Sequence, residues 1–436
     1  MKVKRLRDIQ LIFTPEGHTD EDCISGISQY GVYEDQRDIN PCVLTPNVRA
    51  VKNGFRTFWE TFTDGTCRAR NQPVFEGYNF RDYGFGECDL EPEILSPKDE
   101  RLESYERAMR RAIDKIENED LNLLLVALPD HFDDEAYYRL KSVAFTEKQI
   151  SQFFRIATFD KRFPLVYWNL AISLYAKMEG VPWTLALEPP IEKEPIGVDL
   201  FIGICFVQRD AKSFVGVATV LNRFSEHIVS ISSKPISYTG KQLHMTREDI
   251  RDLVSECLNS VTFGVDSVVV HYATPFNKNE ILGLKDALGE IRKKAFIHIE
   301  TETLTRLYSL SVSDRNAYRG TALIINNNRA VLCTTGRCRI LGTSTELEDE
   351  VEESEEGPTT SFRYRGIGTP KPIGLNQIGD LNIETICRQV LALTKLRWNT
   401  TEVNVRIPAT IEYARKIGYL CKYGIPRTIR SIKYVL

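Results

Sequence analysis

Four polar side chains in the first half of the chain form a set that could bind a phosphate group. Tyr137 and Lys141 are four residues apart in a segment with a helical pattern (134–143), so their side chains should share one face. Gln152 adds an amide, and Lys177 adds a second cation near the end of another predicted helix. Two ammonium groups, a phenol and an amide suit a terminal phosphate. The set predicts a site for the end of a nucleic-acid strand, although a Tyr/Lys pair on a helix is also ordinary protein surface.

The elements that must position this set have the pattern of a parallel α/β layer. Residues 121–129 form a continuous apolar run, which is typical of a strand buried on both faces. The helix with Tyr137 follows after the short loop 130–134. In a layer of this kind ligands gather at the carboxyl edge of the strands, and helix N-termini favour anions. The segment therefore predicts an α/β fold with an anion site at that edge.

A different pattern begins after residues 188–195, which are rich in proline and which we interpret as a linker. Three strand-like runs at 199–208, 213–224 and 227–236 predict an antiparallel meander. Helix, strand, helix and strand are then predicted at 246–263, 267–272, 279–293 and 295–300. This order of elements is that of the ribonuclease-H-like fold. Elsewhere we predict a strand at 6–13, a helical pattern at 50–62, irregular structure at 71–97 and a charged helix at 97–118.

Composition excludes several classes of protein. The 436 residues are 42% hydrophobic and 27% charged, as in soluble globular proteins, and no run of 18 apolar residues predicts a membrane span. The basic N-terminus lacks the apolar core of a signal peptide. The ten cysteines and six histidines are scattered and include no CxxC, so no zinc framework is predicted. We therefore expect a cytoplasmic protein with two or three domains.

The net charge of -4 conceals an uneven distribution. Residues 346–356 carry eight acidic groups and no basic one, so the rest of the chain sums to -4 + 8 = +4. The simplest interpretation of this acidic run is a solvated loop; it could also repel misplaced nucleic acid or contact a basic partner.

Five local sequences resemble those of the short prokaryotic Argonautes, which consist of MID and PIWI domains and lack the N and PAZ domains. The similar sequences are Gln29–Glu34, Tyr137–Ser142 with Ser151–Phe153, Lys177–Trp183, Gly368–Pro372 and Ile407–Arg415. They occur in the family's order from about residue 25 onward. The resemblance implies a Rossmann-like MID domain at 35–187 and a ribonuclease-H-like PIWI domain at 188–436, with residues 1–34 packing on PIWI.

The resemblance also implies roles for the four polar residues. Tyr137 would stack on the first base of a guide strand, Lys141 and Lys177 would donate to its 5′-phosphate, and Gln152 would add an amide donor. Some family members hold a divalent ion here with a glutamine one turn before the second lysine and with the C-terminal carboxylate. This chain has Ser173 at that turn and ends on Leu436, so a Mg²⁺ ion held by the Leu436 carboxylate stays open.

A nuclease of this fold needs clustered carboxylates, because they hold two Mg²⁺ ions at the scissile phosphate. At three of the positions that the resemblance assigns to metal ligands this chain has Cys205, Tyr272 and Arg415. Only Glu248 could match the family's mobile glutamate. A thiol, a phenol and a guanidinium do not make a Mg²⁺ site, so we expect no catalytic metal and no cleavage. Arg415 would contact the nucleic-acid backbone instead.

The resemblance thus implies a catalytically inactive Argonaute that binds a 5′-phosphorylated guide, RNA rather than DNA, and recognises a complementary target, DNA in our expectation. Target binding would be reported to an APAZ-containing or membrane-associated effector protein in prokaryotic immunity. One alternative is a guided nuclease with a displaced two-metal site, for which Asp199 and Asp266 are candidates. Another is a guide-free scaffold. Further basic residues could follow guide phosphates: Lys395, Arg397, Arg406, Lys416 and Lys422.

Overall fold

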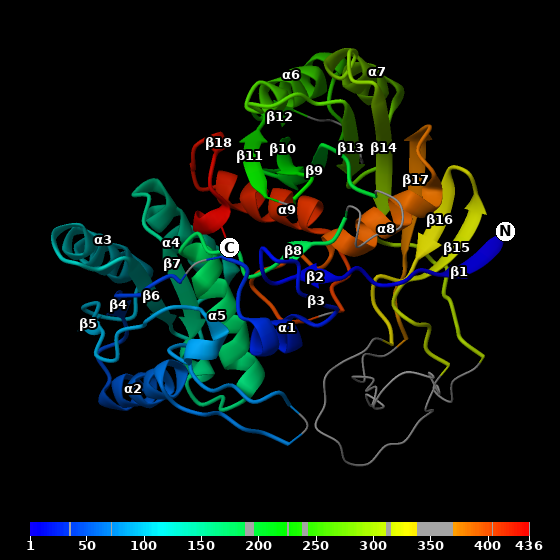
Figure 1. Cartoon of the computed structure of the whole chain (residues 1–436). Helices are drawn as coiled ribbons and strands as arrows, with labels where there is room; N and C mark the ends of the chain where they lie inside the picture. Colours follow the sequence, from blue (N-terminus) through cyan, green and yellow to red (C-terminus); the bar gives the residue numbers. More distant parts are fainter. Residues whose placement is uncertain are drawn as a thin grey trace, which may run out of the picture.

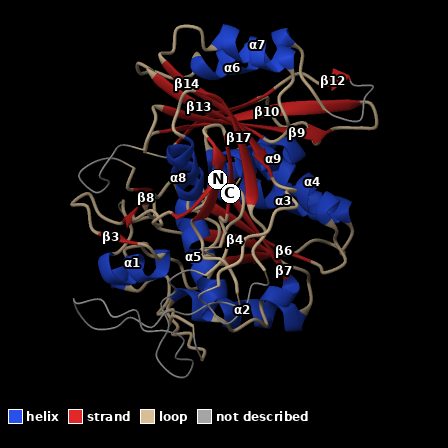
Figure 2. Ribbon diagram, turned by 90° about the vertical axis from the view of Figure 1, so that its right-hand side faces the viewer, coloured by secondary structure: helices blue, strands red, loops and turns tan. Residues whose placement is uncertain are grey.

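The computed structural model describes the chain except for residues 35, 71, 188–195, 225, 238–242, 311–314, 338–368, 403 and 436. The described residues form a mixed α/β structure with two main sheets, each covered by helices on both faces (Figure 1, Figure 2). The predicted α/β class is therefore confirmed. The predicted linker, the acidic run and the terminal residue Leu436 lie outside the described residues.

The first sheet is parallel. Its strands lie in the order β5 (Glu93–Leu95), β4 (Pro41–Leu44), β6 (Leu123–Leu128) and β7 (Ser151–Arg155). One face is covered by α3 (Leu102–Asn118) and α4 (Asp134–Thr146), the other by α2 (Arg49–Thr63) and α5 (Pro164–Lys177). All six residues of β6 are buried because both faces of this central strand meet helices. The predicted strand, loop and helix around residues 121–146 are confirmed.

The second sheet has eleven strands among the described residues. Their order is β1 (Lys2–Arg5), β15 (Thr321–Asn326), β16 (Arg329–Leu332), β17 (Ile373–Gly379), β14 (Lys293–Glu300), β13 (Ser267–Tyr272), β9 (Leu200–Gln208), β10 (Ser213–Asn222), β11 (His227–Ser232) and β18 (Thr428–Ile429), with β12 (Ile236–Ser237) paired to β10. The predicted meander is confirmed, since β9, β10 and β11 pair antiparallel. β13 is parallel to both β9 and β14, as the ribonuclease-H-like order requires.

Side chains of β9 alternate between the two faces of this second sheet. Ile202 and Ile204 pack toward α6 (Arg247–Leu258) and α7 (Lys278–Ala287). Phe201 and Cys205 pack toward the opposite face, which α8 (Ile383–Leu393) and α9 (Ala409–Cys421) cover (Figure 1). This alternation places the chain's last long helix, α9, against the face that carries Cys205.

Gly203 lets α9 approach β9 closely. A Cβ atom at this position would lie 2.4 Å from the backbone carbon of Thr410, in the first turn of α9. Any larger residue would push the helix away from the sheet.

None of the helices that the structure describes is both long enough and apolar enough to cross a membrane.

The N-terminal residues are bound to the large sheet and to residues from mid-chain. β1 pairs antiparallel with β15 at the sheet edge. β2 (Leu11–Ile12) pairs with β3 (Thr19–Asp20) and with β8 (Thr184–Leu185), and α1 (Cys23–Tyr30) follows. The prediction of one strand at 6–13 is wrong, because only Leu11 and Ile12 of that range are in a strand.

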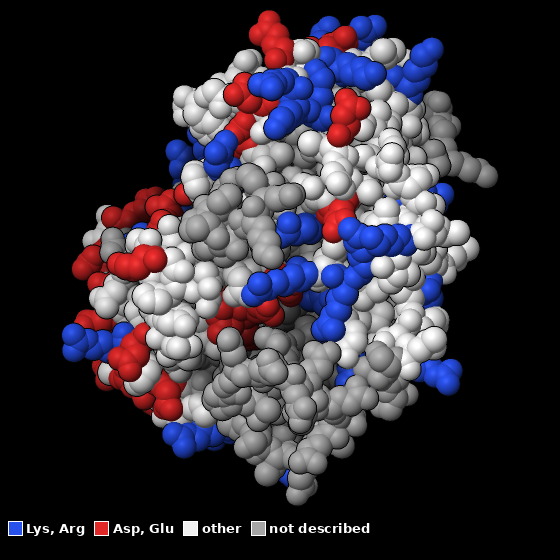
Figure 3. All heavy atoms as spheres, turned by 45° about the vertical axis from the view of Figure 1, so that its right-hand side comes forward, with Lys and Arg blue, Asp and Glu red and all other residues white. Residues whose placement is uncertain are grey.

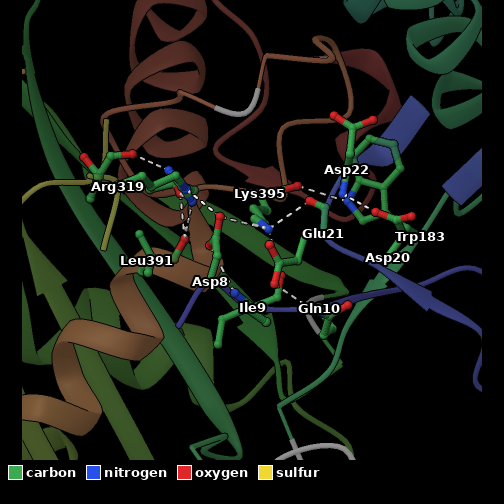
Figure 4. A network of polar contacts seen from close by, with 12 residues as sticks. Asp8, Ile9, Gln10, Asp20, Glu21, Asp22, Trp183, Arg319, Leu391 and Lys395 are labelled. Atoms are coloured by element: carbon green, nitrogen blue, oxygen red, sulfur yellow. Dashed lines mark hydrogen bonds and ion pairs between the residues drawn. The ribbon is translucent and has the colours of Figure 1, made fainter. Parts of the chain in front are cut away.

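A buried ion network explains why the backbone leaves strand geometry there. The Asp8 carboxylate accepts a hydrogen bond from Arg319 Nε at 2.9 Å and pairs with Lys395 Nζ at 3.1 Å (Figure 4). Lys395 also donates to the carbonyls of Ile9 and Glu21, at 2.8 and 3.0 Å. Burial acts to raise the pKa of Asp8, but the charges of Arg319 and Lys395 outweigh it and the pKa lies below its usual value. Through these contacts, residues 8–21 bind Lys395, which follows α8, and Arg319, which precedes β15.

The variant Asp8→Ala should lower the free energy of unfolding by about 3–5 kcal/mol, because two buried cations would lose their carboxylate. The side chains of Arg319 and Lys395 are only 1% and 4% exposed, so water cannot replace it. Urea unfolding of the intact chain measures the change, and Glu290→Ala at an exposed position is the matched control. A change for Asp8→Ala no larger than the control's would contradict the assignment.

Candidate phosphate-binding site

The four polar residues singled out in the sequence line one cavity of about 310 Å³. Tyr137 and Lys141 reach it from α4, Gln152 from β7 and Lys177 from the last turn of α5. The i, i+4 spacing on α4 does place the first two on one face of the helix. The site lies where the parallel sheet and its two flanking helices meet.

The two lysines are held together by one backbone carbonyl. Lys141 Nζ and Lys177 Nζ both donate to the carbonyl oxygen of Ser151, at 3.0 and 2.8 Å, and Lys141 Nζ also donates to Ser151 Oγ at 3.2 Å. Their side chains are almost fully buried, at 1% and 2% exposure. A shared acceptor at the start of β7 thus brings two nitrogen donors to the same point of the cavity.

Gln152 lies in the cavity with its amide oxygen toward the lysines. Its Oε1 accepts hydrogen bonds from Lys177 Nζ and, at 3.3 Å, from Ser173 Oγ. Its Nε2 donates to the carbonyl of Phe153 at 3.0 Å. The predicted donor role of Gln152 therefore requires a rotation of this amide, which would break its hydrogen bond with Lys177 and leave the bond from Lys177 to Ser151 in place.

Tyr137 forms part of the cavity wall through its ring. The ring packs edge-on against Phe153 at 5.3 Å and against Tyr138 at 5.0 Å. Burial raises the pKa of Tyr137 to about 12, so the phenol keeps its proton at neutral pH and can donate a hydrogen bond.

A third lysine, Lys416, lines the same cavity from α9. The sequence singled it out only as one of five scattered basic residues. The other cavity residues named above lie at least 239 positions earlier in the chain, so no local pattern links Lys416 to them. Helix α9 reaches the cavity because it packs on α4, where the rings of Tyr138 and Tyr419 stack at 5.3 Å. The phenol ring of Tyr434 also contacts Phe145 of α4 at 5.5 Å.

Burial and mutual repulsion oppose protonation of the three lysine amines that line the cavity. Burial and the charge of Lys416 lower the pKa of Lys141 to about 7. Burial, with the charges of Lys141 and Lys416, lowers the pKa of Lys177 well below its usual value. Burial and the charge of Arg397 lower the pKa of Lys416 to about 8. Three amines that resist protonation together form a site in which an anion would be strongly stabilised.

The described lining residues offer a Mg²⁺ ion no carboxylate. None of those that the structure describes is Asp or Glu, and nearby lysine charges would repel a dication. The predicted ligand, the Leu436 carboxylate, lies outside the described residues. Nowhere in the described part of the chain do three or more His, Cys, Asp or Glu side chains gather in a way that could hold a metal.

The three positions expected at a nuclease centre do not converge. Cys205 is buried against α9 residues, and burial raises the pKa of its thiol to about 11. Tyr272 points to the opposite face of the sheet, where its hydroxyl donates to Glu280 Oε1 at 2.6 Å. Strand alternation instead puts Ala273 beside Cys205. Arg415 is half-exposed on α9 and pairs with Glu412.

Asp199 and Asp266 lie at the strand starts, at the opposite end of β9 and β13 from Cys205 and Tyr272. Asp199 Oδ2 accepts from the backbone amides of Asp266 and Ser267, both at 2.9 Å, and its other oxygen pairs with Arg223. These contacts hold the starts of two parallel strands together and occupy the carboxylate. Glu248, the candidate mobile glutamate, is exposed at the N-terminus of α6.

The protein surface carries its charge unevenly. In Figure 3, Lys and Arg side chains gather in the upper part and right of the centre of the face shown, whereas Asp and Glu gather mainly on the left. A net charge of -4 therefore coexists with local basic surface on this face.

Comparison with known proteins identifies the family. Residues 123–425 match the Piwi domain, which is well over half of the chain. The chain belongs to the Piwi domain family. The expected relation to Argonautes and the ribonuclease-H-like fold are thereby confirmed.

Individual relatives agree with this assignment. The Argonaute protein of Cereibacter sphaeroides is 23% identical over 312 residues, which are 67% of this chain and 38% of that protein. The structure of Clostridium butyricum Argonaute bound to a guide DNA and a 19-mer target DNA has a TM-score of 0.74 at 17% identity, and the match covers 100% of this chain and 55% of that one. An Argonaute structure from A. aeolicus has a TM-score of 0.62 at 18% identity, with coverages of 99% and 55%. The chain spans about half, or less, of the length of these relatives, and the structural matches show its fold.

The variant Lys141→Met should stabilise the protein at low pH. The lowered pKa of about 7 means that the folded protein disfavours the charged amine, whereas the unfolded chain keeps it up to its usual pKa of roughly 10.4. Removing the amine should raise the free energy of unfolding by on the order of 1–4 kcal/mol below about pH 7, and the gain should vanish toward about pH 10. Urea unfolding across this range measures it, with the exposed Lys161→Met as control. A gain that did not change with pH would contradict this account.

Proposed function

We propose that this protein binds a 5′-phosphorylated guide strand and recognises complementary nucleic acid without cleaving it. The observation that carries the proposal is the cavity lined by Tyr137, Lys141, Gln152 and Lys177. It combines buried amine donors with an aromatic wall at the edge of a parallel sheet. A phosphate monoester with a base attached needs these two surfaces.

Family membership supports the nucleic-acid ligand. The C. butyricum Argonaute, which shares the fold, was solved with a guide DNA and a target DNA. In this proposal base pairing with the guide selects the target, while the protein contacts the backbone of the duplex. Arg415, half-exposed on α9, is the residue that we assign to such a backbone contact.

The absence of cleavage is part of the proposal. A thiol at Cys205 and a methyl group at Ala273 stand side by side where a two-metal centre would need carboxylates. Neither side chain can hold Mg²⁺. The carboxylate of Asp199, the candidate for a displaced centre, is already bonded to two backbone amides and paired with Arg223.

A protein that binds a target without cutting it must pass the signal on. We propose a cytoplasmic protein of prokaryotic immunity that acts with an APAZ-containing or membrane-associated effector. We expect an RNA guide rather than a DNA guide, and a DNA target. The resemblance to short Argonautes motivates these assignments.

Target capture in the presence of divalent metal tests the proposal. The intact chain, loaded with a 5′-phosphorylated RNA or DNA guide, should retain a labelled complementary strand and leave it uncut in Mg²⁺ or Mn²⁺. A non-complementary strand is the control and should be released. Specific cuts at one position of the target would overturn the claim of inactivity and support the displaced-centre alternative. Equal retention of both strands would overturn guide-directed recognition.

A further inference from the structure

We propose that the outer edge of β5 and the groove beside it form a docking site for an extended, basic segment of a protein partner. The segment would add to the parallel sheet as a further strand and place apolar side chains over the groove. The inference goes beyond the proposed function, because it concerns the recognition of a protein and does not depend on a guide strand.

The strand β5 has one side available for pairing. The parallel sheet runs β5, β4, β6 and β7, and within the described part of the chain no strand pairs with the outer side of β5 (Figure 1). An edge strand presents a row of backbone N–H and C=O groups to which another strand can bind. Gln152 of the phosphate cavity is on β7, at the opposite edge of this sheet. A segment bound to β5 would therefore leave the phosphate cavity open.

A groove of about 490 Å³ lies beside this edge. One wall is α2, which contributes Phe55 and Trp59, and the facing wall is the segment 90–94, which leads into β5. The indole Nε1 of Trp59 donates to the backbone carbonyl of Asp89 at 2.8 Å, so a hydrogen bond connects the two walls. The groove is formed before any ligand binds, which lowers the entropy cost of binding.

The groove offers apolar surface to a ligand. Phe55 and Trp59 are buried beneath it, and Ile94 is partly buried against the same core. Leu90, on the facing wall, is 48% exposed. A side chain that packed on Leu90 and Ile94 would remove apolar surface from water and stabilise the complex.

The rim of the groove is acidic. Glu60 of α2 lies on one wall and Glu91 and Glu93 lie on the other, and Arg56 is the one basic side chain among the described residues of the lining. Glu93 pairs with Lys115 at 3.0 Å, whereas Glu60 and Glu91 are exposed and form no ion pair with any described residue. Two carboxylates without a counter-charge are therefore available to lysine or arginine side chains of a ligand.

The charge of the rim selects the kind of ligand. Phosphate groups of nucleic acid would be repelled by Glu60 and Glu91, and a second copy that presented the same edge would bring like charges together. A basic peptide meets both requirements of the site. Successive side chains of a strand point to opposite faces, so an alternating segment places apolar side chains over the groove. Its long basic side chains can still reach the rim carboxylates.

The test is the binding of synthetic peptides to the intact chain, measured by fluorescence anisotropy. The probe is a short capped peptide in which lysine and isoleucine alternate, and its counterpart has glutamate in place of lysine. The lysine peptide should bind at least about tenfold more tightly. Glu60→Lys/Glu91→Lys should weaken its binding by about tenfold or more. The control Glu117→Lys/Glu290→Lys, which makes the same charge change at exposed positions elsewhere, should have little effect.

Strand addition is tested with peptides that are methylated at backbone nitrogens. Methyl groups on alternate nitrogens remove the hydrogen-bond donors of one edge of an extended peptide, so two peptides methylated on opposite edges form a matched pair. One of the pair should lose affinity by about tenfold or more, and the other should bind nearly as the parent peptide does. Hydrogen exchange gives a second readout, because outward-facing amides of residues 93–95 should become protected when the peptide binds.

Several results would overturn the inference. Equal affinity for the lysine and glutamate peptides would contradict the role of the acidic rim, as would binding that a folded Glu60→Lys/Glu91→Lys variant retains. Equal effects of the two methylated peptides would contradict strand addition. Self-association of the intact chain that this double variant abolishes would assign the edge to a second copy. The preference for a 5′-phosphorylated guide should be unchanged in the double variant, so failure of this inference is distinguishable from failure of the proposed function.

Discussion

The burial of three lysine amines in one cavity without a lining carboxylate is the constraint on which the site depends. Each amine loses hydration, and each charge opposes the next, so the pKa values of Lys141, Lys177 and Lys416 are lowered. The Ser151 carbonyl satisfies two of the amines through dipolar contacts but cannot neutralise them. Such an arrangement lowers the stability of the empty protein. A polyanionic ligand would remove that penalty, which is the physical reason for proposing a phosphate group as the ligand of this cavity.

Helix α9 connects this cavity to the rest of the molecule. Its first turn lies against Gly203 at a distance that no larger residue permits, and the helix then crosses to α4 through the Tyr138–Tyr419 stack. One helix therefore covers the Cys205 face of the large sheet and also contributes Lys416 to the cavity. The same helix therefore sets the position of Lys416 in the cavity and the packing around Cys205.

Local pattern predicted the elements whose burial is periodic, and it missed what depends on distant contacts. The apolar run of β6 and the i, i+4 pair on α4 are local signals, and both were found where expected. The strand at 6–13 was wrong because Asp8 bonds to Arg319 and Lys395, more than 300 residues away. Lys416 was predicted only as one of five basic residues, because the other lysines of its cavity are also distant in the sequence. The side of the sheet that Tyr272 faces depends on the register of β13 against β9, which a single strand's sequence does not fix.

The most direct test of the account is a competition between otherwise identical 5′-phosphate and 5′-hydroxyl guides, as RNA and as DNA, for the intact chain and for Lys141→Ala/Lys177→Ala. The account predicts a preference for the phosphate of at least about tenfold, roughly 1.4 kcal/mol, that the double variant loses while its binding of hydroxyl guides changes little. It also predicts tighter binding of RNA than of DNA. Equal binding of both guide ends by the intact chain would contradict the central claim that this cavity holds the end of a guide strand.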